Sequence, residues 1–259
     1  MAIFETHAHY IDGAFDSDRE ELLNSLKENG IEYVVEIGDT LEHSKMAIEL
    51  ANKYDFISCA IGIHPENVFE VNEETYKELE NLLNEKEKNK IVAIGEIGLD
   101  YYWDKENKEV QKEVFKKQLD IALKYDMPVV VHTREASLDT FEIIKEYSKN
   151  GLRGIIHCFS ESLELAKEYE KLGMYIGIGG VVTFKNGKKL VEVVKSLDLK
   201  NFVLETDSPY LSPEPNRGMR NDSRNLKYVV EKISEIKGVS SNEVENITFE
   251  NAKKIYNLK

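Results

Sequence analysis

The chain has 259 residues, of which 41% are hydrophobic and 32% are charged, and 34 basic residues against 48 acidic ones give a net charge of −14. This composition excludes a disordered tail, and no apolar run approaches the roughly 20 residues of a membrane span. The acidic balance excludes a broad basic surface for duplex nucleic acid, but it leaves room for a few positive charges in a cleft.

Short β-type runs alternate along the chain with longer amphipathic stretches. Strands are predicted at 2–7, 32–38, 57–63, 91–98, 128–132, 154–159, 174–180 and 202–207. Charged segments with apolar residues three or four positions apart, such as 106–125 and 162–172, predict helices between them. Eight such alternations over about 250 residues predict a (β/α)8 TIM barrel. A doubly wound open sheet is the alternative, because alternation does not show whether the sheet closes.

The segment after the eighth strand predicts a long loop at 212–218 and extra C-terminal helices. Ser240 and Glu243 have the spacing of a capping box ahead of an apolar helical stripe. Because there is no Pro- or Ser-rich linker, we expect one domain over 1–259. With only Cys59 and Cys158 and no basic-then-apolar start, we expect a cytoplasmic protein with no membrane association and no obligate protein partner.

Histidines and carboxylates recur where the predicted strands end. They are His7 and His9 on the first strand, Glu96 on the fourth, His132 on the fifth, His157 on the sixth and Asp207 on the eighth. In a parallel barrel these ends lie on one face, which is where such enzymes keep their active sites. Four imidazoles and two carboxylates together are suitable donors for two divalent ions, so we expect Mg²⁺, Mn²⁺ or Zn²⁺ as the cofactor.

Each position in this group has a predicted role. His7 and His9 are two residues apart on a strand and point the same way, so they can bind one ion together, although an HxH pair alone is not specific. Asp207 is placed to hold that ion and to accept a proton from the attacking water. The Glu96 carboxylate is suited to bridge two ions, while the last two histidines would complete the second ion's ligands.

Further side chains near these strand ends are candidates for substrate contacts. His64, in GIHP, has two equally supported interpretations, a phosphate contact or a cap for the turn that follows. Arg134 is the best protein-borne phosphate contact, with an ion pair to a neighbouring Glu as the alternative. Tyr101, Tyr102 and Trp103 have the rings to stack on a base or sugar, or to pack their own loop.

The motifs HAH, GIHP, GEIGLDYYW, VHTR, HCFS and LETDSPYL, in this order, resemble those of the TatD family of metal-dependent deoxyribonucleases over essentially the whole chain. The resemblance implies a TIM barrel of the metallo-dependent hydrolase group that uses divalent ions to hydrolyse phosphodiester bonds of DNA. It also implies that Glu205 supports the metal ligands from just before the last of them, and that the ligands are His7, His9, Glu96, His132, His157 and Asp207.

Three positions depart from the family pattern. Glu5 stands where Asp is usual, Glu161 where Gly is common, and Ser223 where Pro is common. Glu5 shares a strand face with His7 and His9 one layer deeper, so we expect it to be paired or protonated and to support the ligands from beneath. The other two departures fall in loops and bear on substrate preference.

The sequence therefore predicts a two-metal deoxyribonuclease that acts on ends or single strands of DNA or on short oligonucleotides, with Asp207 and Glu96 as catalytic residues. An amide or lactone hydrolase on the same barrel is one alternative, but related amidohydrolases often use a modified Lys on the fourth strand, and here Lys90 lies at the opposite end from Glu96. A metal-binding module without catalysis is the other alternative.

Overall fold

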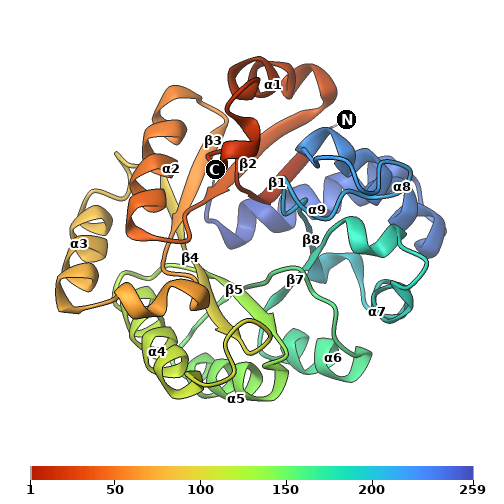
Figure 1. The fold of residues 1–259 in the computed structure, drawn as a ribbon. Helices are drawn as coiled ribbons and strands as arrows, with labels where there is room; N and C mark the ends of the chain where they lie inside the picture. Colours follow the sequence, from red (N-terminus) through yellow and green to blue (C-terminus); the bar gives the residue numbers. More distant parts are fainter. Residues whose placement is uncertain (1, 259) are drawn as a thin grey trace. The chain divides into compact units, whose positions relative to one another are not determined.

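Over residues 2–258, the part of the chain that the computed structural model describes, eight strands alternate with helices (Figure 1). They form one sheet in the order β1 to β8, and each described strand pair is parallel. This order and alternation define the predicted (β/α)8 class.

The strand and helix bounds agree closely with the predicted segments. The strands are β1 Ile3–Ala8, β2 Ile31–Ile37, β3 Ile57–Ile61, β4 Ile91–Asp100, β5 Val129–Arg134, β6 Gly154–Ile156, β7 Tyr175–Ile178 and β8 Phe202–Leu204. The α-helices are α1 Arg19–Ser25, α2 Leu41–Lys53, α3 Glu73–Asn84, α4 Lys108–Lys124, α5 Ser137–Ser148, α6 Leu163–Lys171, α7 Lys188–Ser196, α8 Leu226–Lys237 and α9 Ser241–Ile255. Only the strand ends move: β4 runs on to Asp100, so Glu96 lies inside it, and β6 and β8 stop before His157 and Asp207.

The chain divides into two compact units, which we describe separately. Unit 1 runs to Glu36 and adds 158–171 and the chain from Tyr175 onward; unit 2 contains 37–157 and 172–174. In unit 1, β1 pairs with β2, β7 pairs with β8, and Ala8 forms a parallel bridge with Ser208. In unit 2, β3 to β6 pair in sequence order. That residues 1–259 form one domain stays a prediction.

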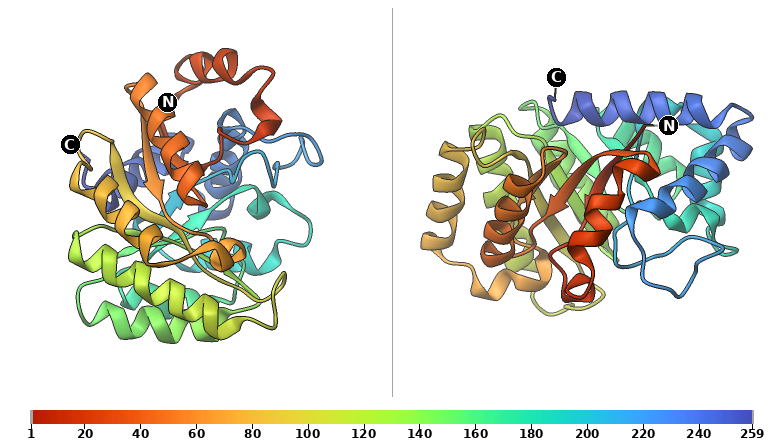
Figure 2. Two further views of the ribbon diagram at one scale, coloured as in Figure 1. Left: turned by 60° about the vertical axis from the view of Figure 1, so that its left-hand side comes forward. Right: turned by 90° about the horizontal axis from the view of Figure 1, so that it is seen from above.

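Helix α9 packs against the beginnings of β1 and β8 in unit 1. The Asn251 amide donates to the carbonyls of Leu199 and Phe202, and the Tyr256 hydroxyl donates to the Thr6 carbonyl. Figure 2 shows α9, in blue, running past the N-terminus. The predicted C-terminal helices are thus present, and Ser240 caps α9 by accepting the Glu243 N–H. Because α9 covers the beginnings of β1 and β8, their carboxyl ends are left for a site.

Two buried glutamines of α4 fix the chain where it leaves β3 and β4 in unit 2. Gln118 accepts the Ile63 N–H at 2.8 Å and donates to the Ile63 carbonyl at 3.0 Å. Gln111 makes the same paired contact with the backbone of Asp100, at 2.8 and 2.9 Å. Each amide bonds two backbone groups where a strand ends, so both strand ends are held firmly. Among the described residues, no helix combines the length and the apolar character needed to cross a bilayer.

Candidate metal centre

The first histidine–carboxylate cluster lies in unit 1, where β1 and β8 are adjacent. The Nε2 atoms of His7 and His9 are 3.1 Å apart, and Asp207 Oδ1 lies 3.8 and 3.5 Å from them. Asp207 donates its N–H to the His7 carbonyl and has φ +58°, a left-handed conformation that Asp tolerates better than most residues. These three side chains offer ligand atoms within 4.8 Å of one another, and two imidazoles with a carboxylate suit a divalent ion.

The second cluster gathers around one oxygen of Glu96 in unit 2. Glu96 Oε1 lies 2.9 Å from His132 Nδ1, 3.8 Å from His64 Nε2 and 3.9 Å from His157 Nε2. The β4–β5 register shifts between Ile94 and Ile97, and such an irregularity re-aims the side chain that lies within it. The donor set therefore also fits a divalent ion, with Glu96 at its centre.

Both ring nitrogens of His132 contact carboxylates, because its Nε2 lies 2.9 Å from Asp100 Oδ2. Burial alone would lower the pKa of His132, but the hydrogen bonds to Asp100 and Glu96 outweigh it and raise this pKa to about 9. A carboxylate on the far nitrogen of a metal-binding imidazole fixes the ring orientation and raises its basicity. Asp100 is thus a supporting residue of the candidate site.

We did not predict Asp100 from the sequence. Its carboxylate is 1% exposed, and its Oδ1 accepts the N–H groups of Tyr102 and Trp103 at 2.8 and 3.0 Å. The sequence feature that could have indicated Asp100 is its spacing of four residues from Glu96, which places both side chains on one face of a strand.

The two interpretations of His64 are both compatible with its surroundings. Its Nδ1 accepts the Glu66 N–H at 3.2 Å, so it caps the turn that Pro65 begins. Burial and the nearby His132 lower the pKa of His64 to about 4, so the ring is neutral. Since Nδ1 accepts, the proton is on Nε2, the atom that faces Glu96. His64 can therefore donate a hydrogen bond inside the cluster, which fits a phosphate contact better than a metal bond.

Glu205 follows β8, two residues before Asp207, and the space for its carboxylate depends on a glycine. It is 1% exposed, and its Oε1 accepts the N–H of Cys158 at 2.6 Å. A Cβ on Gly177, in the neighbouring strand β7, would lie 2.3 Å from Glu205 Oε2. The absence of a side chain at 177 is what leaves room for this carboxylate, and Glu205 remains a proposed support of the ligands.

Glu5 is fully buried below His7, as expected from the strand pattern. Its Oε1 accepts the N–H groups of His7 and Thr206, which connects β1 to the chain after β8. Burial raises the pKa of Glu5 to about 8. Ser223 hydrogen-bonds the Tyr10 hydroxyl at 2.7 Å, and Tyr10 follows the same strand as Glu5. Glu161 is half-buried before α6.

Glu36, at the end of β2, is a second buried acid that the sequence did not single out. Its two oxygens accept the N–H groups of Tyr10 and Ile11 at 2.9 Å. Burial, partly offset by these bonds, raises the pKa of Glu36 to about 7. The carboxylate holds the turn that follows His9 and so helps to place that ring.

The aromatic residues after β4 divide into two kinds. Tyr101 is buried, and its hydroxyl donates to Asp139 on α5 at 2.7 Å, so its role as a substrate contact stays a prediction. Tyr102 and Trp103 are exposed, and the Arg134 guanidinium lies over the Tyr102 ring at 3.9 Å. We considered an ion pair between Arg134 and a neighbouring Glu. That neighbour, Glu135, pairs with Lys105 at 3.1 Å.

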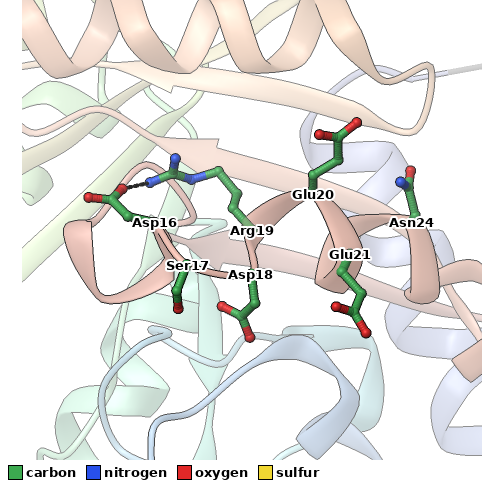
Figure 3. A pocket seen from close by; sticks show the side chains of 7 residues that line it. All are labelled: Asp16, Ser17, Asp18, Arg19, Glu20, Glu21 and Asn24. Carbon is green, nitrogen blue, oxygen red and sulfur yellow. Dashed lines mark hydrogen bonds and ion pairs between the residues drawn. The ribbon is translucent and has the colours of Figure 1, made fainter.

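A separate hollow beside α1 is lined mainly by acidic side chains, and Figure 3 shows one of them, Asp16, paired with Arg19. Asp16 pairs with Arg19 at 2.6 Å, and Asp18 pairs with Arg220 through both oxygens. None of the proposed metal ligands lines it.

The fold and the two clusters define the class of metal-dependent hydrolases on a (β/α)8 barrel, and comparison with known proteins agrees. The family model described as TatD related DNase matches residues 4–257. The metal-dependent hydrolase YabD of Bacillus subtilis is 41% identical, with 99% of each chain covered. The chain belongs to the TatD family.

Two solved structures share both the fold and the family. The TatD homologue YjjV of Escherichia coli matches with a TM-score of 0.93 at 27% identity, covering 99% of this chain and 98% of its own. A TatD family hydrolase of Entamoeba histolytica matches with a TM-score of 0.85 at 27% identity, covering 99% of each chain. The recognition and the fold class from sequence are therefore confirmed.

Gly177→Ala should destabilise the protein, because the new methyl group would displace the buried Glu205 carboxylate. We expect a loss of about 1–3 kcal/mol in the free energy of unfolding, measured by denaturant titration. Gly13→Ala is the matched control, since its Cβ would meet only Asp16 Oδ2 at 3.6 Å and should change stability by less than about 0.5 kcal/mol. Equal effects from both substitutions would contradict this account of Glu205.

Asp100→Asn should lower the pKa of His132 from about 9, because the amide keeps an oxygen for Tyr102 and Trp103 but removes the negative charge from the imidazole. The measurement is an NMR titration of the histidine rings in metal-free protein. Metal affinity should also fall by about 10–100-fold. Asp104→Asn, in the same loop, is the control, because Asp104 bonds only Glu106 and Asn107 there. An unchanged His132 titration would disprove the supporting role.

Proposed function

We propose that this chain is a deoxyribonuclease that hydrolyses phosphodiester bonds at ends or in single strands of DNA, with two divalent ions as cofactor. The observation that carries the proposal is the pair of histidine–carboxylate clusters at carboxyl ends of parallel strands, in a chain of the TatD family. The matched relatives carry the name metal-dependent hydrolase, which supports the class of reaction. A cytoplasmic location stays a prediction.

The residues of this chain divide between the two ions. His7, His9 and Asp207 would hold the first, and His132 and His157 the second, with Glu96 as the carboxylate that both share. When bound, Mg²⁺, Mn²⁺ or Zn²⁺ would polarise the scissile phosphate and make an attacking water more acidic. The proposal thus requires both clusters to serve one phosphodiester.

Asp207 is the proposed proton acceptor for the attacking water. Its side chain is 20% exposed, whereas that of His7 is fully buried, so solvent reaches the carboxylate. A general base must be reached by the water that it deprotonates, and this exposure allows it. The neutral His64 would donate its Nε2 proton to a phosphate oxygen.

The charge of the whole chain limits the substrates that we propose. A net charge of −14 repels a long duplex held by its phosphates, whereas a short segment or an end needs only local contacts. DNA ends, single strands and short oligonucleotides are therefore the proposed substrates.

No observation favours the amide or lactone hydrolase. Lys90, the lysine nearest the start of β4, donates to the carbonyls of Ala51 and Tyr54 and so is committed to the opposite end of the strand from Glu96. The other alternative, a metal-binding module without catalysis, would be excluded by turnover of a DNA substrate by purified protein.

Glu96→Gln should lower hydrolysis of a single-stranded oligonucleotide by at least about 100-fold, because it removes the shared negative charge but keeps the shape of the side chain. Circular dichroism should show an unchanged fold, and Glu250→Gln on α9 serves as the control. Wild-type protein treated with chelator should lose the same activity and regain it with added metal. Full activity of the variant or of the chelated protein would disprove the proposal. The proposal would also be wrong if wild-type protein hydrolysed simple amides but not a nitrophenyl phosphodiester.

A further inference from the structure

Two large aromatic side chains directly after β4 are exposed to solvent. Trp103 is 63% exposed and Tyr102 is 45% exposed. The Arg134 guanidinium lies 3.9 Å from the centroid of the Tyr102 ring and 5.5 Å from that of Trp103. We call Tyr102, Trp103 and Arg134 the aromatic–arginine platform. Loop packing does not explain it, because Tyr101 is the ring that this loop buries.

We propose that the platform binds one unpaired nucleobase of single-stranded DNA, with the base stacked on Trp103 and its phosphate against Arg134. This inference rests on the proposed function and deepens it by naming the part of the substrate that is recognised. Aromatic rings beside arginine are the usual means of holding single strands without sequence preference, because every base has a face to stack.

The geometry assigns separate tasks to the three side chains. The rings of Tyr102 and Trp103 meet edge to face, at 85° with centroids 4.9 Å apart. The arginine lies closer to the Tyr102 ring, and Trp103 is the more exposed of the two rings, so we assign the stacking surface to Trp103. Among the residues that the structure describes, Arg134 forms no direct ion pair, although its charge acts on the nearby Glu66 carboxylate. Its charge is therefore available to a phosphate.

Asp100 connects the platform to the second cluster. One of its oxygens accepts the N–H groups of Tyr102 and Trp103, and the other lies 2.9 Å from His132 Nε2. Since this carboxylate is buried, both contacts are held in place, and the backbone that carries the two rings is fixed before a ligand binds. A base on Trp103 would thus be held one side chain away from a proposed metal ligand.

The overall charge favours a base over a phosphate as the main contact. Phosphate binding works against the net charge of −14, whereas stacking is independent of it. A base in a duplex has both faces covered by its neighbours, so Trp103 selects unpaired bases. The platform therefore accounts for a preference for single strands or frayed ends.

The first test uses Trp103 as its own reporter, because it is the only tryptophan in the chain. Chelator-treated full-length protein is titrated with single-stranded oligothymidylate while tryptophan emission is followed. We expect saturable quenching by this strand and none by an abasic strand of the same length. Equal quenching by both strands, or no quenching by either, would overturn the platform.

The second test measures turnover. Trp103→Ala should raise KM for oligothymidylate about tenfold with kcat unchanged, and Trp103→Phe should restore most of the loss. The abasic strand should be cleaved alike by wild type and variants. Tyr125→Ala is the control, because Tyr125 also lies under a cation, Lys124, but follows helix α4 instead of the carboxyl end of a strand.

The outcomes separate this inference from the proposed function. If wild-type protein cleaves neither strand while Trp103 emission still reports base-dependent binding, the proposed hydrolysis is wrong and the platform stands. If it cleaves both strands with equal KM and Trp103→Ala changes nothing, the platform is overturned and the proposed hydrolysis stands.

Discussion

The candidate site depends on hydrogen bonds that replace the solvent around its buried carboxylates. Removing a carboxylate from water costs several kcal/mol unless hydrogen bonds or opposite charges replace the solvent. Around the strand ends this chain buries the acids Glu5, Glu36, Glu96, Asp100 and Glu205. Backbone N–H groups donate to Glu36, Asp100, Glu205 and one oxygen of Glu5, and His132 contacts Glu96 and Asp100. The strand ends are thus fastened by acids that also orient the proposed metal ligands.

This arrangement gives each cluster a rigid support. In unit 1, Glu5 links the backbone beside His7 to that beside Asp207, and Glu36 holds the turn after His9. In unit 2, Asp100 holds His132 from the side away from Glu96. Precise placement of ligands by their neighbours is what metal-assisted hydrolysis requires, since small displacements of the reacting groups are costly. The same Asp100 also fixes the backbone of Tyr102 and Trp103, which carries the rings of the platform.

Much of this could be predicted from the sequence because the strands follow a strict rule. Buried parallel strands read as apolar runs, and the polar residues that close them, such as His7, His132 and His157, mark the functional end. The roles of Asp100 and Glu36 could not be predicted, since they depend on which backbone groups lie opposite them. The separation of Tyr101 from Tyr102 and Trp103 depends on how one loop turns, which composition does not determine. Local pattern thus predicts the elements, while the supporting contacts require the pairing of distant strands.

The central claim is that both clusters hold divalent ions in the active protein. The most direct test is anomalous diffraction from crystals of active protein loaded with Mn²⁺ or Zn²⁺, together with metal content in solution. The account predicts two anomalous peaks, one among His7, His9 and Asp207 and one among Glu96, His132 and His157. An active protein with no metal at these residues, or with metal only in the acidic hollow beside α1, would contradict it.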